Sequence, residues 1–497
     1  MHRMTKWART KTALATTAVA ALVAFVAQPS AVAEAVASDP DCELPGAVNV
    51  ANGYDVDFCV AEDQLFIIAA NYKPFEYGTD GQDDNRQSTA IWDQIVGEQL
   101  QAAFPGVDIK YATWDYPVRY EDLEAAGVVP DIVIDNPRNR IDRDLEPLGW
   151  VQDMTAQIES SDIDLASLNQ AAVEQIRSRS DGGLYGVPLF VNDHVLFYNK
   201  KIFDKFGVKY PEAGSTYDEV YRMAKKLTRQ EGTDAYKGYM QHPDNYLEVN
   251  QLGLYPFTDA GSEEPAAEDV AVDITTPEWQ ALVDNMYRFL TIERNNFTTT
   301  DDFVKGDMSR PGHVAMAVDT LEKLPLYQGN ALFTEPDDAD DWAQWITSVD
   351  VGVTSMPVLT QGDNTTYQPN QLAAFVTKQS TQQELAMDIV AWLTSEAGQV
   401  AFSSHAMKPV LENEATEAAF GSAIPELEGV DTSGVFWGEN ATVTGYENTE
   451  YWDLPMYKVF RQHVLIDGMT PEAALQVTQE EDIPAYIASK AGTGQDW

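Results

Sequence analysis

The sequence predicts an exported α/β protein with two lobes, and three observations lead to this fold class. Short apolar segments alternate with segments of helical spacing along most of the chain. The chain has 497 residues, which is more than one ordinary hydrophobic core serves. The N-terminal residues have the order of a secretory signal peptide.

The signal peptide is predicted over residues 1–33. Four basic residues come first, at Arg3, Lys6, Arg9 and Lys11. An apolar stretch over 12–27 follows, and Ala31-Val32-Ala33 forms a small-x-small cleavage pattern. The apolar stretch is short for a membrane span, and no other run of about 20 apolar residues occurs. We therefore expect no transmembrane helix, and a mature protein that is secreted or associated with the cell envelope.

The mature chain is strongly acidic. Loss of the four basic residues leaves 28 basic against 79 acidic side chains, a net charge of about −51. Such a field repels nucleic acid and anionic lipid, so neither is an expected partner. Acidity spread along the whole chain is more simply an adaptation for solubility in a saline or alkaline medium.

The only two cysteines, Cys42 and Cys59, lie in an N-terminal segment over 34–64. Disulfides persist outside the cytoplasm, so we expect a local bridge that ties this segment down. Cys42 follows Asp39-Pro40-Asp41 rather than an apolar and small stretch. The sequence therefore contains no lipobox, and lipid anchoring is not expected.

The first half of the chain has the rhythm of an α/β lobe around a largely parallel sheet. Three short apolar runs are strand candidates, at 65–70, 107–113 and 131–134. Helical spacing occurs over 90–104 and over the more polar 161–179. Residues 185–198 are then predicted to be extended and to begin a second series of elements.

The second series continues the alternation to the C-terminus. Further strand candidates lie at 236–240, 314–318, 349–357 and 372–377. Helices are predicted over 216–230, 277–290, 381–395, 398–402 and most of 455–488. Thr216 and Glu219 have capping-box spacing, and proline opens the helices at Pro277 and Pro471. The acidic stretch 335–341 is predicted to be a solvated loop.

One run resembles a known family. LYGVPLFVNDHVLFYNKKIFDKFGV, from Leu184 to Val208, is similar to the family 1 extracellular solute-binding proteins of ATP-binding-cassette importers, which include maltose- and oligosaccharide-binding proteins. Further similar segments follow in the family's order, at 215–228, 303–316, 351–357, 385–402 and 468–473. The sequence differs from the family at Tyr217, where tryptophan is usual, and in lacking the lipobox cysteine common in Gram-positive relatives.

The resemblance implies a periplasmic-binding-protein-like fold of type II, in which two α/β lobes exchange strands through a hinge and hold ligand in the cleft between them. From the family pattern, the first lobe would comprise 65–184 and 371–411. The second lobe would comprise 185–370 and 412–497.

Candidate ligand-binding residues follow the strand candidates, because open α/β sheets bind ligands at the carboxyl ends of their strands. They also include aromatic residues of the segment 437–452, where relatives place a stacking side chain. The candidates are Tyr72, Lys73, Glu76, Trp114, Asp115, Asp135, Asn136, Asn192, Asp193, Asp319, Trp437, Tyr446 and Trp452. Aromatic faces with amide and carboxylate neighbours suit the apolar faces and hydroxyl rims of sugars. A structural role in a loop or turn is the alternative to ligand binding for several candidates, notably Trp114, Asp193 and Asp319.

The expected function is capture of a carbohydrate, most simply an oligosaccharide, by a monomer that delivers it to the permease of an ATP-binding-cassette transporter. A polyamine ligand is an alternative, since acidic side chains would pair with it. A secreted glycoside hydrolase is a further alternative, but G-x-S-x-G and H-E-x-x-H are absent.

We predict no catalytic residue, no cofactor and no metal. The loop GTDGQDDN, which contains Asp83, lacks the spacing of the twelve-residue calcium loop and is more simply a solvated turn.

Overall fold

The computed structural model describes residues 44, 47–50, 58–61, 63–70, 78–79, 82–83, 91–114, 120–180, 183–241, 246–247, 249–258, 271–295, 312–329, 346–442 and 454–493. Asp39–Trp497 forms one compact unit. The signal peptide and the acidic loop 335–341 lie outside the described residues, as does most of the segment 34–64.

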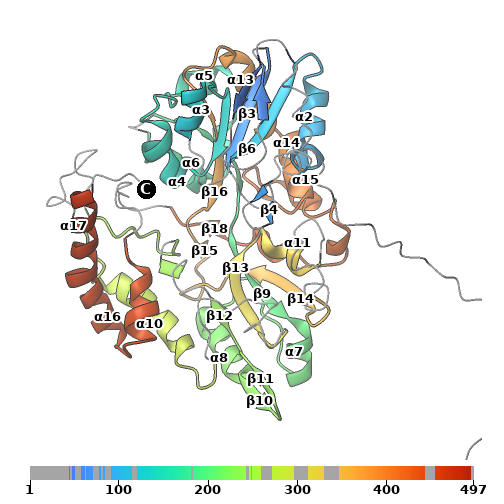
Figure 1. The fold of residues 1–497 in the computed structure, drawn as a ribbon. Helices are drawn as coiled ribbons and strands as arrows, with labels where there is room; N and C mark the ends of the chain where they lie inside the picture. Colours follow the sequence, from blue (N-terminus) through green and yellow to red (C-terminus); the bar gives the residue numbers. More distant parts are fainter. Residues whose placement is uncertain are drawn as a thin grey trace, which may run out of the picture. The chain divides into compact units, whose positions relative to one another are not determined.

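The larger sheet has six strands in the order β17-β8-β16-β7-β3-β6. Its strands β3, β6 and β16 are labelled in Figure 1. Its strands are β3 (Leu65–Ala70), β6 (Ile109–Trp114), β7 (Ile132–Asp135), β8 (Val187–Val191), β16 (Gln371–Val376) and β17 (Lys408–Pro409). β3 pairs in parallel with β6 and β7, whereas β16 is antiparallel to β7 and β8, and β17 is antiparallel to β8. The predicted parallel arrangement is confirmed for the three strand candidates that led to it, β3, β6 and β7. The whole sheet is mixed, because β16 and β17 bring the chain back into it in the opposite direction.

A four-stranded sheet has the order β12-β13-β9-β14. Its strands are β9 (His194–Asn199), β12 (Met240–Gln241), β13 (Met316–Thr320) and β14 (Val351–Ser355). β9 is antiparallel to both of its neighbours. Short two-stranded ladders join β1 (Val48–Val50) to β2 (Phe58–Val60), β4 (Gly78–Thr79) to β5 (Gln82–Asp83), β10 (Arg229–Glu231) to β11 (Asp234–Tyr236), and β15 (Thr365–Thr366) to β18 (Glu439–Asn440).

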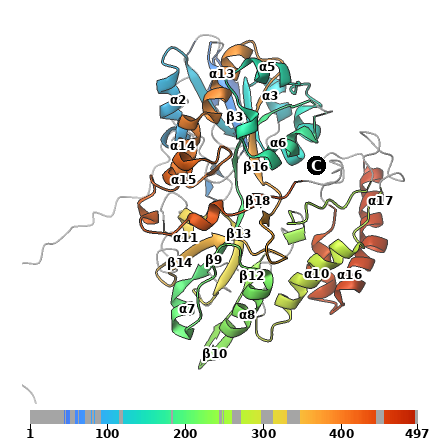
Figure 2. The ribbon, with the colours of Figure 1, turned by 180° about the vertical axis from the view of Figure 1, so that it is seen from behind.

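Each large sheet is surrounded by its own buried apolar cluster. Helices with residues in the cluster of the six-stranded sheet include α2 (Glu98–Ala103), α3 (Tyr120–Ala126), α5 (Thr155–Ser160), α6 (Gln170–Arg177), α13 (Gln383–Thr394) and α14 (Glu396–Ser404), with α15 (Glu414–Ala419) against α14. Helices with residues in the other cluster include α7 (Lys200–Phe206), α8 (Tyr217–Leu227), α10 (Pro277–Leu290), α11 (Lys323–Tyr327), α16 (Pro471–Val477) and α17 (Ile483–Thr493). Helices α10, α16 and α17 lie side by side in both ribbon views (Figures 1 and 2). Two separate cores of this kind suit the two lobes that the sequence predicts.

Local sequence signals placed several helix ends correctly. Thr216 caps α8 with the predicted capping box, in which its hydroxyl accepts from Glu219 N and its own N–H donates to the Glu219 carboxylate. Helix α10 spans the predicted Pro277–Leu290. The helix expected over 161–179 begins only at Gln170, because the side chain of Asn169 accepts from Ala172 N and caps it there.

The single strand predicted over 236–240 is wrong. Tyr236 ends β11, and Met240 begins β12 in another sheet. Between them lies Gly238, where an added Cβ would lie 2.1 Å from the carbonyl oxygen of Ala224 on α8. This close approach of two backbones breaks the strand, which apolar patterning alone does not reveal.

Among the described residues, no helix is both long and apolar enough to cross a membrane.

Candidate ligand-binding site at the junction of the two sheets

The chain passes from the six-stranded to the four-stranded sheet at Asn192 and Asp193. β8 ends at Val191 and β9 begins at His194. The family pattern placed this crossing at Tyr185, yet all of β8 belongs to the six-stranded sheet. The return crossing, over residues 356–370 between β14 and β16, ends where β16 begins at Gln371.

A buried ion pair ties the first crossing to β17. The ammonium of Lys408 donates to Asp193 Oδ2 at 2.8 Å, and the side chains are 2% and 6% exposed. Asn440 Nδ2 donates to the other carboxylate oxygen of Asp193 at 2.6 Å. Burial lowers the pKa of Lys408, but the charges of Asp193 and Glu412 outweigh this effect and raise it to about 12. Both oxygens of Asp193 are thus occupied within the protein.

Asn440 extends this network to other segments. Its Nδ2 also donates to the carbonyl of Tyr367 at 3.0 Å, and its Oδ1 accepts from Asn169 Nδ2 at 2.8 Å. The buried network therefore joins α6, β18, the return crossing and the first crossing.

A second chain of polar contacts reaches the surface of the junction. Asn136 follows β7, and its Nδ2 donates to Asn370 Oδ1 at 3.0 Å. The carbonyl of Asn370 accepts from Asn192 N at 2.6 Å. The side chain of Asn192 accepts from Glu322 N at 3.0 Å and donates to the Glu322 carboxylate at 2.9 Å. The structure thus brings together the predicted residues Asn136 and Asn192, and adds Asn370 and Glu322.

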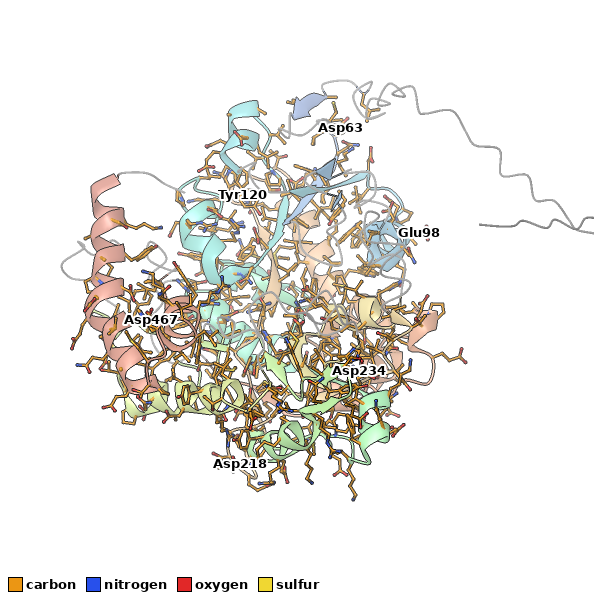
Figure 3. The ribbon with its side chains drawn as sticks, turned by 60° about the horizontal axis from the view of Figure 1, so that its bottom comes forward. Asp63, Glu98, Tyr120, Asp218, Asp234 and Asp467 are labelled. Carbon is orange, nitrogen blue, oxygen red and sulfur yellow. The ribbon has the colours of Figure 1, made fainter. Side chains whose placement is uncertain are left out.

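Asp135 is buried next to Asn136 and fixes the position of that residue. It is 3% exposed, and it accepts from Tyr120 Oη and from Asn136 N, each at 2.6 Å, with Arg140 at 3.5 Å (Tyr120 is labelled in Figure 3). Burial raises the pKa of Asp135 against the lowering effects of Arg140 and Tyr120. Its contacts position Asn136, and they occupy both carboxylate oxygens.

Asp319 lies near the end of β13 at the same junction. Its carboxylate accepts from Lys323 at 3.0 Å, from Tyr327 Oη at 2.9 Å and from Thr320 N at 2.8 Å. Glu322 and Lys323 are half-buried, and neither was predicted as a site residue, because only Asp319 directly follows the strand candidate at 314–318. The rule of inspecting residues after a strand would have found both, had it been applied to the start of α11.

His194, the first residue of β9, was also missed, because histidines were considered only for metal-ligand spacing. It is 6% exposed, and its ring centroid lies 5.1 Å from that of Tyr367. Neither ring nitrogen has a hydrogen-bond partner among the described residues. Burial lowers the pKa of His194 to about 4, so the ring is neutral at pH 7.

The aromatic ring that contacts His194, that of Tyr367, is itself held by hydrogen bonds. Its hydroxyl lies 3.0 Å from that of Tyr217 and accepts from Gln241 Nε2 at 2.6 Å. Hydrogen bonds with Tyr217 and Gln241 therefore fix the Tyr367 ring, and the His194 ring packs on that ring.

Of the other predicted site residues, Trp437 and Trp114 are among the residues that the structure describes. Trp437 is half-buried, and an added Cβ on Gly214 would lie 2.5 Å from its ring. Trp114 is the last residue of β6. The candidates that lie outside the described residues are Tyr72, Lys73, Glu76, Asp115, Tyr446 and Trp452.

The disulfide also stays a prediction, because Cys42 lies outside the described residues. Cys59 is 2% exposed on β2, and no described cysteine is free. Over the described residues, no group of three or more His, Cys, Asp or Glu side chains could hold a metal ion.

Two sheets, two cores and a polar junction crossed repeatedly by the chain define a periplasmic-binding-protein-like fold of type II. Residues 83–400, more than half of the chain, match the sequence model of a family described as bacterial extracellular solute-binding protein. The chain belongs to this family.

Solved structures with the same fold include three sugar-related proteins. An ABC substrate-binding protein from Listeria monocytogenes, in complex with cycloalternan, is 19% identical, with a TM-score of 0.55 over 86% of this chain and 99% of that one. A sugar transporter protein from Rhizobium etli in an open conformation is 15% identical, with a TM-score of 0.60 over 85% and 99%. A cyclo/maltodextrin-binding protein complexed with maltotetraose is 17% identical, with a TM-score of 0.57 over 87% and 99%. At these identities the similarity establishes the fold.

Proposed function

We propose that this protein captures a carbohydrate, most simply an oligosaccharide, outside the cytoplasm and delivers it unchanged to the permease of an ATP-binding-cassette importer. Membership of the extracellular solute-binding family supports capture and transport. The similar folds solved with cycloalternan and maltotetraose support a sugar as the solute.

The observation that carries the proposal is the polar chain Asn136–Asn370–Asn192–Glu322 at the junction. Asn136, Asn370 and Glu322 are all half-buried, and hydrogen bonds set their positions. Amide and carboxylate groups held in this way match the donors and acceptors of sugar hydroxyls. A site that pairs such groups rejects a solute that lacks the hydroxyls.

Closure around the solute is the mechanism that we propose. The solute would contact residues of the six-stranded sheet first, such as Asn136, and then reach Glu322 beside the four-stranded sheet. Contacts available only in the closed form would shift the population toward it. The Asp193–Lys408–Asn440 network would act as the rigid axis, because it joins the crossing segments by buried contacts.

A thermal-shift screen of the mature protein tests the proposal. The panel contains maltotetraose, cycloalternan and simple sugars, with polyamines and amino acids as controls. A solute at a hundred times its dissociation constant stabilises the folded state by about 2.7 kcal/mol. A rise in Tm with a sugar supports the proposal, and a rise with polyamines alone refutes it. Chromatography of each stabilising sugar after incubation checks that it is recovered unchanged.

A further inference from the structure

The His194 side chain is an exception to the rule that buried polar groups are hydrogen-bonded. The residue is 6% exposed, and neither Nδ1 nor Nε2 has a partner among the described residues. Buried polar atoms in native proteins are almost always bonded to protein, water or ligand. This imidazole therefore requires a partner of its own.

The position of His194 places that partner at the junction. His194 comes directly after the crossing residues Asn192 and Asp193, and in the β9–β13 ladder it lies opposite Thr320. Its ring packs on Tyr367 of the return crossing. The charges that act on it are those of Asp319, Asp193 and Lys323. The two carboxylates accept from other groups, since Asp193 is occupied by Lys408 and Asn440, and Asp319 by Lys323, Tyr327 and Thr320 N.

The chemistry of the ring limits what the partner is. A neutral imidazole has one N–H donor and one nitrogen acceptor. A hydroxyl group both donates and accepts, so a single hydroxyl-bearing molecule serves either nitrogen. A carboxylate would satisfy only the donor, and an ammonium group only the acceptor. The low pKa of the buried ring, about 4, keeps it in this neutral form at pH 7.

We infer that His194 is a binding residue for a neutral hydroxyl group at the junction of the two sheets, supplied either by an ordered water molecule or by the bound carbohydrate. The second source rests on the proposed function, whereas the first does not. If the carbohydrate supplies the hydroxyl, His194 is a specificity-determining position that neither the strand-end rule nor the family resemblance identified.

Nitrogen NMR of the unmutated protein, labelled at histidine, tests the bound ring directly. If a hydroxyl holds the imidazole, the unliganded or the maltotetraose-saturated protein shows one tautomer of His194, with well-separated nitrogen shifts. Averaged shifts of the two nitrogens in both samples, from rapid exchange of tautomers, would overturn the inference. This measurement needs no variant, so it holds even if substitution prevents folding.

Substitution then distinguishes the two sources. His194→Phe keeps a ring of similar size without polar atoms, and His405→Phe is the control, because the His405 ring is bonded to Ala401 and Ser404. Tm is measured without sugar, and maltotetraose affinity is measured by calorimetry. A lower Tm than wild type with unchanged affinity identifies water as the partner. A loss of affinity of tenfold or more identifies a carbohydrate hydroxyl.

If His194→Phe raises Tm and binds maltotetraose as well as wild type, the ring has no such partner and the inference is wrong. An apolar replacement is expected to stabilise when it removes an unsatisfied polar group. If maltotetraose and the other sugars bind neither protein, the proposed function fails. The nitrogen shifts and the Tm comparison still decide whether His194 holds a water molecule.

Discussion

The Lys408 ammonium lies 2.8 Å from the carboxylate of Asp193, and the two residues are 215 positions apart in the sequence. Asp193 belongs to the first crossing between the sheets, and Lys408 begins β17. Neither side chain is more than 6% exposed. The contact therefore joins distant parts of the chain at the point where the chain changes sheets, and its removal has a predictable cost.

Lys408→Met is expected to lower the free energy of unfolding by roughly 3–5 kcal/mol, because it leaves the carboxylate of Asp193 buried without its cation. Urea denaturation measures the change. Lys200→Met is the control, since the Lys200–Asp350 pair spans 3.4 Å at the surface, with side chains 29% and 55% exposed. That variant should lose less than about 1 kcal/mol. Equal losses in the two variants would contradict a special role for the buried pair.

Stability should depend on His194 at acid pH. The unfolded imidazole has a pKa of about 6.5, and burial lowers the folded value to about 4. As pH falls from about 6.5 toward 4, the unfolded chain takes up a proton that the folded chain does not, so His194 reduces stability over this window. The loss amounts to about 3 kcal/mol.

His194→Gln removes this loss. Urea denaturation at several pH values between 4 and 7 should show a shallower decline for the variant than for wild type. The carboxylates that titrate nearby are common to both proteins, so they cancel in the comparison. Identical slopes for the two proteins would show that His194 titrates normally.

Gly214→Ala should destabilise the protein by about 2–4 kcal/mol. Gly214 has φ +74, and a Cβ there would lie 2.5 Å from the Trp437 ring. The cost combines left-handed backbone strain with overpacking. Gly232→Ala is a matched control, because Gly232 has φ +59 but open space around the Cβ position, and it should cost only about 1–2 kcal/mol. Thermal denaturation compares them, and equal costs would exclude the clash with Trp437.

Glu322→Ala should weaken binding of the sugar identified by thermal shift about tenfold or more, if the junction is the ligand site. The substitution removes a half-buried carboxylate, which is also the acceptor for Asn192 Nδ2, while the bond from the backbone N–H of residue 322 to Asn192 Oδ1 is kept. Glu231→Ala, on the β10–β11 hairpin, is the control and should leave affinity unchanged. Calorimetry gives both dissociation constants, and a wild-type value for Glu322→Ala would place the site elsewhere.

Much of the fold could be predicted because its signals are local. The strand at 65–70 is a short apolar run, and the helix from Pro277 carries a proline start and helical spacing, so both were correct. The break at Gly238 was missed because it depends on the approach of α8, whose residues lie earlier in the chain. The antiparallel direction of β16 was missed for a similar reason, since strand direction within a sheet is set by where the chain re-enters it.

The candidate site was predicted less completely. Asn136 and Asn192 were predicted as candidates because they follow strands, and the structure connects them through Asn370. Glu322 was missed because it lies three residues beyond Asp319, the residue that directly follows the strand candidate. His194 was missed because no sequence pattern indicates that a ring nitrogen lacks a hydrogen-bond partner. In both cases the missing information is the surroundings of the side chain, which the residue type does not reveal.

The sequence by itself determined the family, the alternation of strands and helices, the acidic charge and the residue types available for binding a solute, because these depend on composition and on neighbours a few positions apart. Only the tertiary structure decided that Asp193 pairs with Lys408, that the crossing lies at Asn192–Asp193, and that His194 is buried beside Tyr367. Burial and pairing between residues hundreds of positions apart arise when two sheets close on one junction, and they have no local signature in the chain.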